Sequence, residues 1–250
     1  MRNPLDERYF SDFTRKNYAK LLKIALKNHN FIDYTSVNDH KKYILWRHDV
    51  DYSINRAVEL AKIENKLGVI STFFLHLQSP GYNIFDRKTY RQIKQILSLG
   101  HKLGLHFDAN FYEIRNKDEL ISKLCVGSDI IYDLFDEKIK VFSFHEPSKF
   151  VLSEFTDYEY SGLINTYSNF FKNEVAYCSD SNGIWRFKRL EDFLIDNSED
   201  KLQVLTHPVW WSREVLSPRD RIKKCFEDIK LENLKIYYDE RKKRKRPVVK

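Results

Sequence analysis

The sequence predicts an α/β protein in which parallel strands alternate with helices in a β/α barrel. Short apolar runs rich in Ile, Val, Leu and Phe alternate with longer segments of helical periodicity. Several of these runs end in a group of ionisable residues, which is typical of strands whose carboxyl ends surround a functional site. The length of 250 residues is usual for one such barrel.

Composition argues against a disordered, membrane-spanning or disulfide-stabilised protein. Apolar residues make up 42% of the chain, which is close to the globular average. No stretch approaches the roughly 18–20 apolar residues that cross a bilayer. The N-terminal segment lacks the apolar core of a signal peptide, and the three cysteines, Cys125, Cys178 and Cys225, are widely spaced. We therefore expect a cytoplasmic protein.

The net charge of +7 is concentrated at the C-terminus. Seven of the 43 basic residues and no acidic residue lie in 241–250, so the first 240 residues carry 36 of each sign. We expect residues 1–240 to form a single domain, with 1–42 as a helical addition packed on it, and 241–250 to form a basic tail. Such a tail can contact an anionic membrane surface weakly. Because the basic charge belongs to this tail and not to a face of the domain, we expect no nucleic acid partner.

The first half of the chain predicts an amphipathic helix followed by three strand–helix units. Residues 12–28 place apolar side chains at helical spacing, with lysines between them. The three strands are expected at 43–51, 69–76 and 102–108. The helices that follow them are expected at 53–67, 86–99 and 118–135. Ser53 as N-cap and Gly68 as a C-terminal stop bound the first of these helices.

The second half predicts further strands and one long helix. A fourth strand is expected at 140–147 and a last one at 201–208, and both end in a proline. Weaker strand patterns lie at 163–168 and 174–180. A long polar helix begins near Ser217 or Pro218 and continues through 221–229.

Ionisable residues gather where the predicted strands end. Five of the eight histidines lie at or just before such an end. The group consists of His48, Asp49, Asp51, His76, His106, Asp108, His145, Glu146 and His207. Because the carboxyl ends of parallel strands meet at one mouth of a barrel, we expect these side chains to converge.

This set of side chains suits metal-assisted hydrolysis of an amide or ester. Side chains two residues apart on a strand point the same way, so Asp49 and Asp51 can face one pocket, as can His106 and Asp108. Carboxylate and imidazole groups bind zinc and other divalent first-row metals. A carboxylate outside the metal site can accept the proton of a bound water, and a histidine opposite can protonate the leaving group.

Five segments resemble, in the same order, the motifs of the polysaccharide deacetylase family, also called the NodB-homology family. They are WRHDVDYS, GHKLGLHFD, FSFHEPS, SDSNGIW and VLTHP, and they span about residues 43–210. The resemblance implies an irregular, partly open (β/α) barrel. It implies one divalent metal ion, with zinc expected first, and a carbohydrate substrate.

The resemblance also implies roles for particular residues. Asp49 matches the catalytic base and His207 the general acid. Asp51 and His106 match metal ligands, although Val50 separates two aspartates that are adjacent in many members. Asp180 and Trp185 match the fourth motif, which supports the base and lines the pocket.

Two departures leave the third metal ligand open. Asn110 stands where the family has its second metal-binding histidine, and His145 stands where the third motif has an arginine. We expect His145 to complete the site from the neighbouring strand, with Asp108 and Asn110 as the alternatives. His76 can support the ligands, whereas His101 lies at the start of its strand and therefore at the other end of the barrel.

Other residues near the predicted mouth are candidates for supporting roles. Arg47 should share a face with Asp49, and His48 should point into the strand–helix interface. Trp210 and Trp211 can stack on a sugar ring or pack at the barrel rim. Arg186 and Arg213 can bind an anionic group.

The resemblance implies a metal-dependent hydrolase that removes an acetyl group from an N-acetylated sugar, nucleotide sugar or short glycan in surface-polysaccharide biosynthesis. A de-N-formylase, or another C–N amide hydrolase with the same metal chemistry, is one alternative. A catalytically impaired, glycan-binding relative is the other, and Asn110 at a ligand position motivates it.

Overall fold

The computed structural model describes residues 7–246, so the first six residues of the expected N-terminal addition and the last four of the expected tail lie outside it. Its centre is a curved sheet in the order β6-β7-β5-β4-β3-β2-β9-β8, with β1 paired to β2. The strands are β1 Asn30–Phe31, β2 Tyr43–Val50, β3 Thr72–His76, β4 Lys102–Phe107, β5 Val141–Phe144, β6 Glu159–Tyr160, β7 Leu163–Asn165, β8 Ala176–Ser179 and β9 Lys201–Thr206. All pairs are parallel except β6 with β7. Since β6 and β8 end the sheet and do not pair with each other, the predicted partly open α/β barrel is confirmed.

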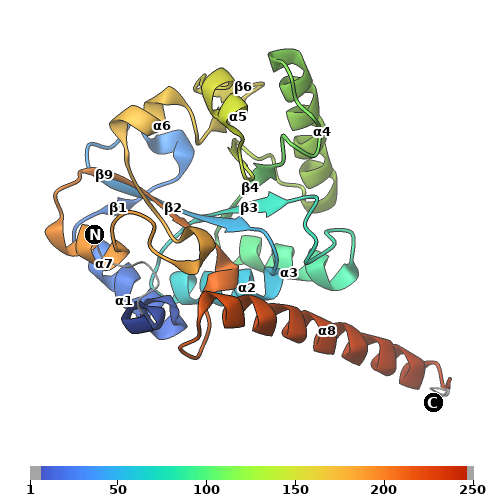
Figure 1. The fold of residues 1–250 in the computed structure, drawn as a ribbon. Coiled ribbons are helices and arrows are strands. Elements are labelled where there is room, and N and C mark those ends of the chain that lie inside the picture. Colours follow the sequence, from blue (N-terminus) through green and yellow to red (C-terminus); the bar gives the residue numbers. More distant parts are fainter. Residues whose placement is uncertain (1–6, 247–250) are drawn as a thin grey trace.

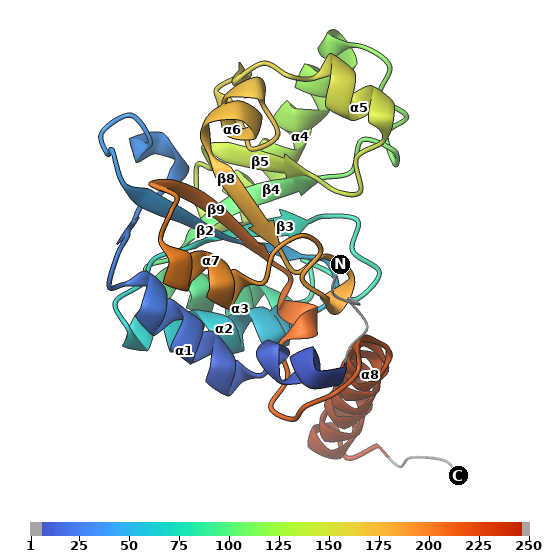
Figure 2. The same ribbon diagram turned by 60° about the vertical axis from the view of Figure 1, so that its left-hand side comes forward.

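Helices cover the outside of this sheet (Figure 1). They are α1 Arg15–Ala25, α2 Ile54–Lys66, α3 Arg87–Ser98, α4 Lys117–Phe135, α5 Lys149–Glu154, α6 Asn169–Glu174, α7 Leu190–Asp196 and α8 Pro218–Lys243. Short 3-10 turns are η1 Glu7–Phe13, η2 Tyr34–Ser36, η3 Ser181–Gly183 and η4 Pro208–Trp210. Figure 2 shows α1, α2 and α3 side by side along one face of the sheet.

The strongest sequence patterns correspond to elements of the structure. Ser53 caps α2 by accepting a hydrogen bond from the Arg56 amide, and Gly68 follows the helix with a positive φ of 72°, as its role as a stop requires. The apolar run at 69–76 becomes a strand only from Thr72. The weaker pattern at 174–180 forms β8, and the short helices α5, α6 and α7 were not predicted.

The strand β2 lies at the centre of the sheet and is buried along its whole length. Because side chains alternate along a strand, Trp46, His48 and Val50 face the helices, whereas Arg47 and Asp49 face the concave side. The register pairs His76 with His106, so the carboxyl ends of neighbouring strands lie level. This arrangement brings the ends of β2, β3, β4, β5 and β9 to one mouth.

The N-terminal segment shares a core with the sheet. Tyr18, Leu21 and Leu22 of α1 are buried in one cluster with Trp46 of β2 and Trp211. The Trp46 indole donates to the Tyr18 hydroxyl at 2.7 Å, which fixes the helix against the strand. Fully burying side chains of this size stabilises a fold by about 1.5–3 kcal/mol each.

The last helix projects from the body of the protein (Figure 1). Its first half is anchored by Arg221 and Cys225, which are buried, whereas Leu234, Tyr237 and Tyr238 are exposed. The helix continues to Lys243, so the expected basic tail begins as helix rather than as free chain. None of the helices in residues 7–246 is long and apolar enough to span a bilayer.

Candidate metal centre

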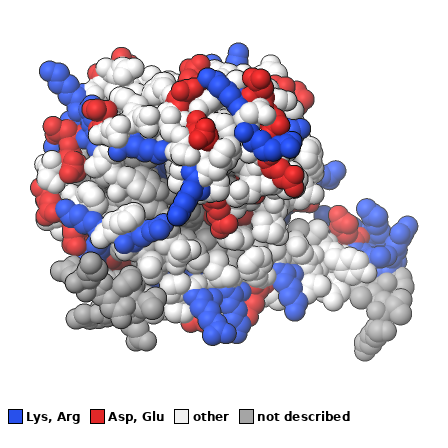
Figure 3. Space-filling view, turned by 45° about the horizontal axis from the view of Figure 1, so that its top comes forward, with Lys and Arg blue, Asp and Glu red and all other residues white. Residues whose placement is uncertain are grey.

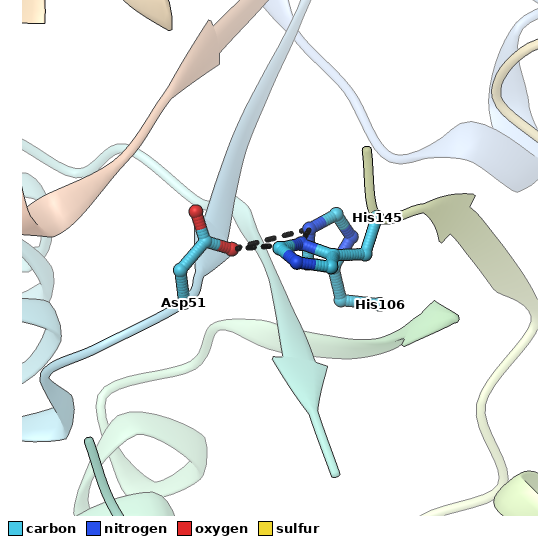
Figure 4. Close-up of side chains that lie close together, drawn as sticks. All are labelled: Asp51, His106 and His145. Atoms are coloured by element: carbon cyan, nitrogen blue, oxygen red, sulfur yellow. Dashed lines mark hydrogen bonds and ion pairs between the residues drawn. The ribbon is translucent and has the colours of Figure 1, made fainter. Parts of the chain in front are cut away.

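Three predicted ligands meet at the mouth of the half-barrel (Figure 4). Asp51 follows β2, His106 lies on β4 and His145 follows β5. Oδ1 of Asp51 is 3.2 Å from Nε2 of His106 and 3.7 Å from Nδ1 of His145. Nδ1 of His145 is 3.2 Å from Nε2 of His106. One oxygen and two ring nitrogens therefore form a small triangle of donor atoms.

The dimensions of this triangle fit a divalent metal ion. Zinc bonds of 2.0–2.2 Å to oxygen and nitrogen place the ligand atoms of a tetrahedral site about 3.3–3.6 Å apart. The observed separations of 3.2, 3.2 and 3.7 Å are close to that spacing. Oδ1 of Asp51 is also buried and has no hydrogen-bond partner among the described residues. An unsatisfied buried carboxylate oxygen is costly unless a cation faces it.

Electrostatics keep Asp51 ionised. Burial alone would raise the pKa of the Asp51 carboxyl, but its contacts with His106 and His145 and the charge of His207 outweigh burial and hold the pKa well below its usual range. Burial likewise opposes protonation of His145, yet Asp51, Glu146 and Asp108 raise the pKa of His145. The carboxylate is thus available as a ligand at any physiological pH.

The orientation of the His106 ring is fixed by contacts on its Nδ1 side. Its Nδ1 lies 2.7 Å from the Ser143 hydroxyl and 3.7 Å from Oδ2 of Asp49. A proton on Nδ1, donated to Ser143, leaves the lone pair of Nε2 directed at Asp51 and His145. Ser143 was not predicted as a site residue, although its position two residues before His145 puts the two side chains on one face.

Asp49 lies deeper than the triangle and is paired with Arg47. Nη2 of Arg47 donates to Oδ2 of Asp49 at 2.8 Å, which confirms that the two share a face. Nη1 of Arg47 donates to Thr166 at 2.7 Å. Burial lowers the pKa of Arg47, but Asp49 and the nearby Tyr167 and Tyr34 raise it well above its usual value. The Asp49 side chain is 2% exposed, so Asp49 is a buried partner of Arg47 and His106.

His207 is held on the opposite side of the mouth by Asp180. Its Nδ1 is 2.6 Å from Oδ1 of Asp180, and its backbone amide is 3.0 Å from both carboxylate oxygens. The Trp211 indole donates to the same carboxylate at 2.9 Å. Burial opposes protonation, but Asp180, Asp51 and Asp49 raise the pKa of His207 to about 9. Nε2 of His207 faces Asp51, 3.9 Å from its Oδ2.

The two alternative third ligands, Asp108 and Asn110, lie outside the triangle of Asp51, His106 and His145. Asp108 lies next to His76, with Oδ2 3.7 Å from Nε2 of that ring. Asn110 is exposed, and its amide donates to the carbonyl of Glu146 at 3.1 Å. His145 is therefore the residue that joins Asp51 and His106.

The predicted supporting residues divide into packed and exposed groups. Trp185 stacks on Phe13, with ring centroids 5.0 Å apart, and donates to Asp12 at 3.0 Å. Trp210 is half-buried against Gly183. The Arg186 guanidinium is exposed and lies 5.5 Å from the ring centroid of Phe187.

Two other histidines take part in a separate buried network. Nε2 of His48 is 2.7 Å from Oε1 of Glu64 on α2, so His48 points into the strand–helix interface as predicted. Nδ1 of His101 is 3.7 Å from Oε2 of the same carboxylate, away from the mouth. These residues join β2 and β4 to α2 and do not belong to the metal centre.

Known protein structures share the general arrangement of strands and helices seen in this chain. No family model and no curated protein matches this sequence. A peptidoglycan N-acetylglucosamine deacetylase is 15% identical over 81% of this chain and 92% of its own, with a TM-score of 0.47. A family 4 acetyl xylan esterase from Clostridium thermocellum, in complex with a cobalt ion, is 16% identical over 78% of this chain and 84% of its own, with a TM-score of 0.46.

A third structure is a pseudoenzyme of the CE4 family from Bacillus anthracis. It is 15% identical over 77% of this chain, with a TM-score of 0.42, and this chain covers 62% of its length. At these identities and TM-scores the likeness is confined to the general arrangement of strands and helices. The function proposed next depends on the residues of this chain.

Proposed function

We propose that the protein is a metal-dependent hydrolase of the polysaccharide deacetylase type, which removes an acetyl group from an N-acetylated sugar or short glycan. The observation that carries the proposal is the triangle of Asp51, His106 and His145, with the imidazole of His207 facing it. A site of this kind combines ligands for a Lewis acid with a proton donor.

Asp51, His106 and His145 would hold the cation, for which zinc is the first candidate because two imidazoles and a carboxylate are its usual ligands. Such a cation, when bound, polarises an acyl carbonyl and lowers the pKa of a bound water. Ser143 and Asp49 hold His106 in the tautomer that presents Nε2 to the site.

His207 is the proposed general acid. Its raised pKa of about 9 leaves it protonated at neutral pH. Asp180 takes the Nδ1 side of the ring, so the proton on Nε2 faces the mouth. There it can be delivered to the departing amine, which must be protonated to leave. In this proposal Asp180 acts through His207, whereas the resemblance assigned it to the base.

Asp49 is the proposed base, and because it is buried, a water molecule must reach its carboxylate for it to act. One carboxylate oxygen is engaged by Arg47 and the other lies 3.5 Å from Ser143. A water would have to reach it beside His106. The Asp108 carboxylate is more accessible, with its side chain 18% exposed, and is the second candidate. The two are separated by the Asp49→Asn experiment described below.

The proposal includes a substrate class and a cellular compartment. The substrate would be an N-acetylated sugar, nucleotide sugar or short glycan used in surface-polysaccharide biosynthesis. The compartment would be the cytoplasm, since Cys125, Cys178 and Cys225 are all unpaired, in agreement with a reducing environment.

We also propose that α8 lets the protein associate weakly with an anionic membrane surface. Lys230, Leu234, Tyr237 and Arg241 follow one another at spacings of four, three and four residues, and so share one face of the helix. Figure 3 shows Lys and Arg side chains gathered at the far end of this helix. Aromatic and basic side chains on one helical face are suited to a lipid surface.

The function is tested by incubating the zinc- or cobalt-loaded protein with N-acetylated sugars and measuring acetate. Acetate released by the wild type and not by Asp51→Asn supports the proposal. Release of formate or ammonia from a different amide would identify another C–N hydrolase. Binding of glycan without turnover, in a protein that holds its metal, would identify a catalytically impaired relative.

A further inference from the structure

A second group of metal-binding side chains lies beside the first. His76, Asp108 and His145 each offer a ligand atom, and these atoms lie within 4.8 Å of one another. Nε2 of His76 is 3.7 Å from Oδ2 of Asp108. The rings of His76 and His145 lie 4.1 Å apart between centroids and are tilted by 31°. Two imidazoles and one carboxylate therefore meet again, a few ångströms from Asp51.

The buried imidazole of His76 indicates that the second group of side chains is suited to binding a ligand. The residue is 3% exposed, and neither of its ring nitrogens has a hydrogen-bond partner among the described residues. A neutral imidazole carries one N–H donor and one lone pair, and leaving both unsatisfied in a buried position is costly.

His145 connects the two groups. Its Nδ1 faces Asp51 and His106, and the same residue also belongs to the group formed with His76 and Asp108. To serve both groups, His145 would offer Nδ1 to the first cation and Nε2 to the second, and its ring N–H proton would be released to solvent. Each ion would then have one carboxylate, Asp51 or Asp108, to offset part of its charge.

We propose that His76, Asp108 and His145 form a second divalent-cation site adjoining the first, so that this mouth binds two cations. The inference rests on the proposed metal-dependent function, which supplies the first cation. The second site would bind more weakly than the first, because two neighbouring cations repel each other. It also opens to solvent, since the side chain of Asp108 is 18% exposed and that of His145 16%.

The donor set defines the ion that the second site takes. Imidazole nitrogen with carboxylate oxygen selects zinc, cobalt, iron or manganese over magnesium and calcium, which prefer oxygen ligands. A cation there would have open positions toward solvent, where an oxygen-rich group of the substrate could bind. The function of the second site would thus be to hold substrate next to the first.

The test is the number of cobalt or zinc ions bound per chain, measured by titration and by plasma mass spectrometry. We expect two equivalents in the wild type, with the second appearing as a separate phase in the visible spectrum of the cobalt protein. Asp51→Asn, His76→Gln and Asp108→Asn should each bind one. His29→Gln, which changes a buried histidine away from the mouth, should keep two. Circular dichroism and thermal unfolding identify any variant that fails to fold.

One equivalent in the wild type that persists in both His76→Gln and Asp108→Asn would overturn the second site. In that case acetate release by the loaded wild type would leave the proposed function intact, since only Asp51, His106 and His145 are needed for it. Loss of the second spectral phase in both variants, with the first unchanged, supports the proposal.

Discussion

Nδ1 of His207 lies 2.6 Å from Oδ1 of Asp180, and this contact determines the protonation state of the imidazole that faces Asp51. The two residues come from the ends of neighbouring parallel strands, β9 and β8. The carboxylate receives the ring, the backbone amide of His207 and the Trp211 indole. A carboxylate with this many donors is fixed in place, and the imidazolium beside it is stabilised.

Replacing Asp180 should therefore remove the raised pKa of His207. In Asp180→Asn we expect the high-pH limit of turnover to move from near pH 9 toward pH 6.5, because the proton on Nε2 is lost earlier. The measurement is the pH dependence of kcat in both proteins. Identical profiles would show that His207 is not the general acid.

The same pair should make stability depend on pH. The folded-state pKa of His207 lies above its unfolded value of 6.5, so its contribution is complete below pH 6.5 and is lost as pH rises through about 9. The loss amounts to at most about 3 kcal/mol for a shift of this size. Urea unfolding at pH 6 and pH 9.5 measures it, and Asp180→Asn should show a flatter dependence.

Asp49→Asn separates a base from a positioning residue. If Asp49 accepts the proton of water, turnover falls by about 10²–10⁴-fold while metal affinity stays close to that of the wild type. If it acts mainly on His106 and Arg47, metal affinity falls as well. Affinity for the first equivalent of cobalt and acetate release, measured on one preparation, distinguish the two roles, and Asp108→Asn tests the second candidate base in the same way. Unchanged turnover in Asp49→Asn would exclude both roles.

Ser143→Ala should weaken metal binding without affecting the fold. The hydroxyl is 2.7 Å from Nδ1 of His106 and fixes the ring that supplies Nε2. Loss of such a supporting contact lowers metal affinity by about 10–100-fold. The control is Ser168→Ala, because Ser168 is also buried but its hydroxyl has no hydrogen-bond partner among the described residues. Equal affinities in the two variants would show that His106 does not depend on Ser143.

The sequence was informative about the strands and about which ionisable groups lie at their ends. Alternation along β2 was enough to place Arg47 with Asp49 and to turn His48 toward the helices. The third ligand could not be chosen from sequence, because His145 and Asp108 lie near each other and only the direction of each side chain separates them. The pairing of Asp180 with His207 also stayed hidden, since it depends on which strands are neighbours.

Short helices were the main omission in the fold. Helices α5 and α6 have six residues each and α7 has seven, too few to show helical periodicity. Their ends depend on local contacts, such as the Ser148 side chain that accepts from the Val151 amide. The end of α8 was missed for another reason: the run of basic residues reads as a solvated tail, yet three of them continue the helix.

The basic end of α8 should bind vesicles that contain anionic lipid and not vesicles of neutral lipid alone. Each cation near such a surface contributes about 1 kcal/mol, so replacing Arg241, Lys242 and Lys243 by Gln should weaken binding by the order of 100-fold. Cosedimentation at low and high salt measures this, because screening removes the attraction. A matched variant with Lys123, Lys138 and Lys140 changed to Gln removes the same charge elsewhere and should bind like the wild type. Equal losses in the two variants would show that net charge, and not the basic end of α8, is responsible.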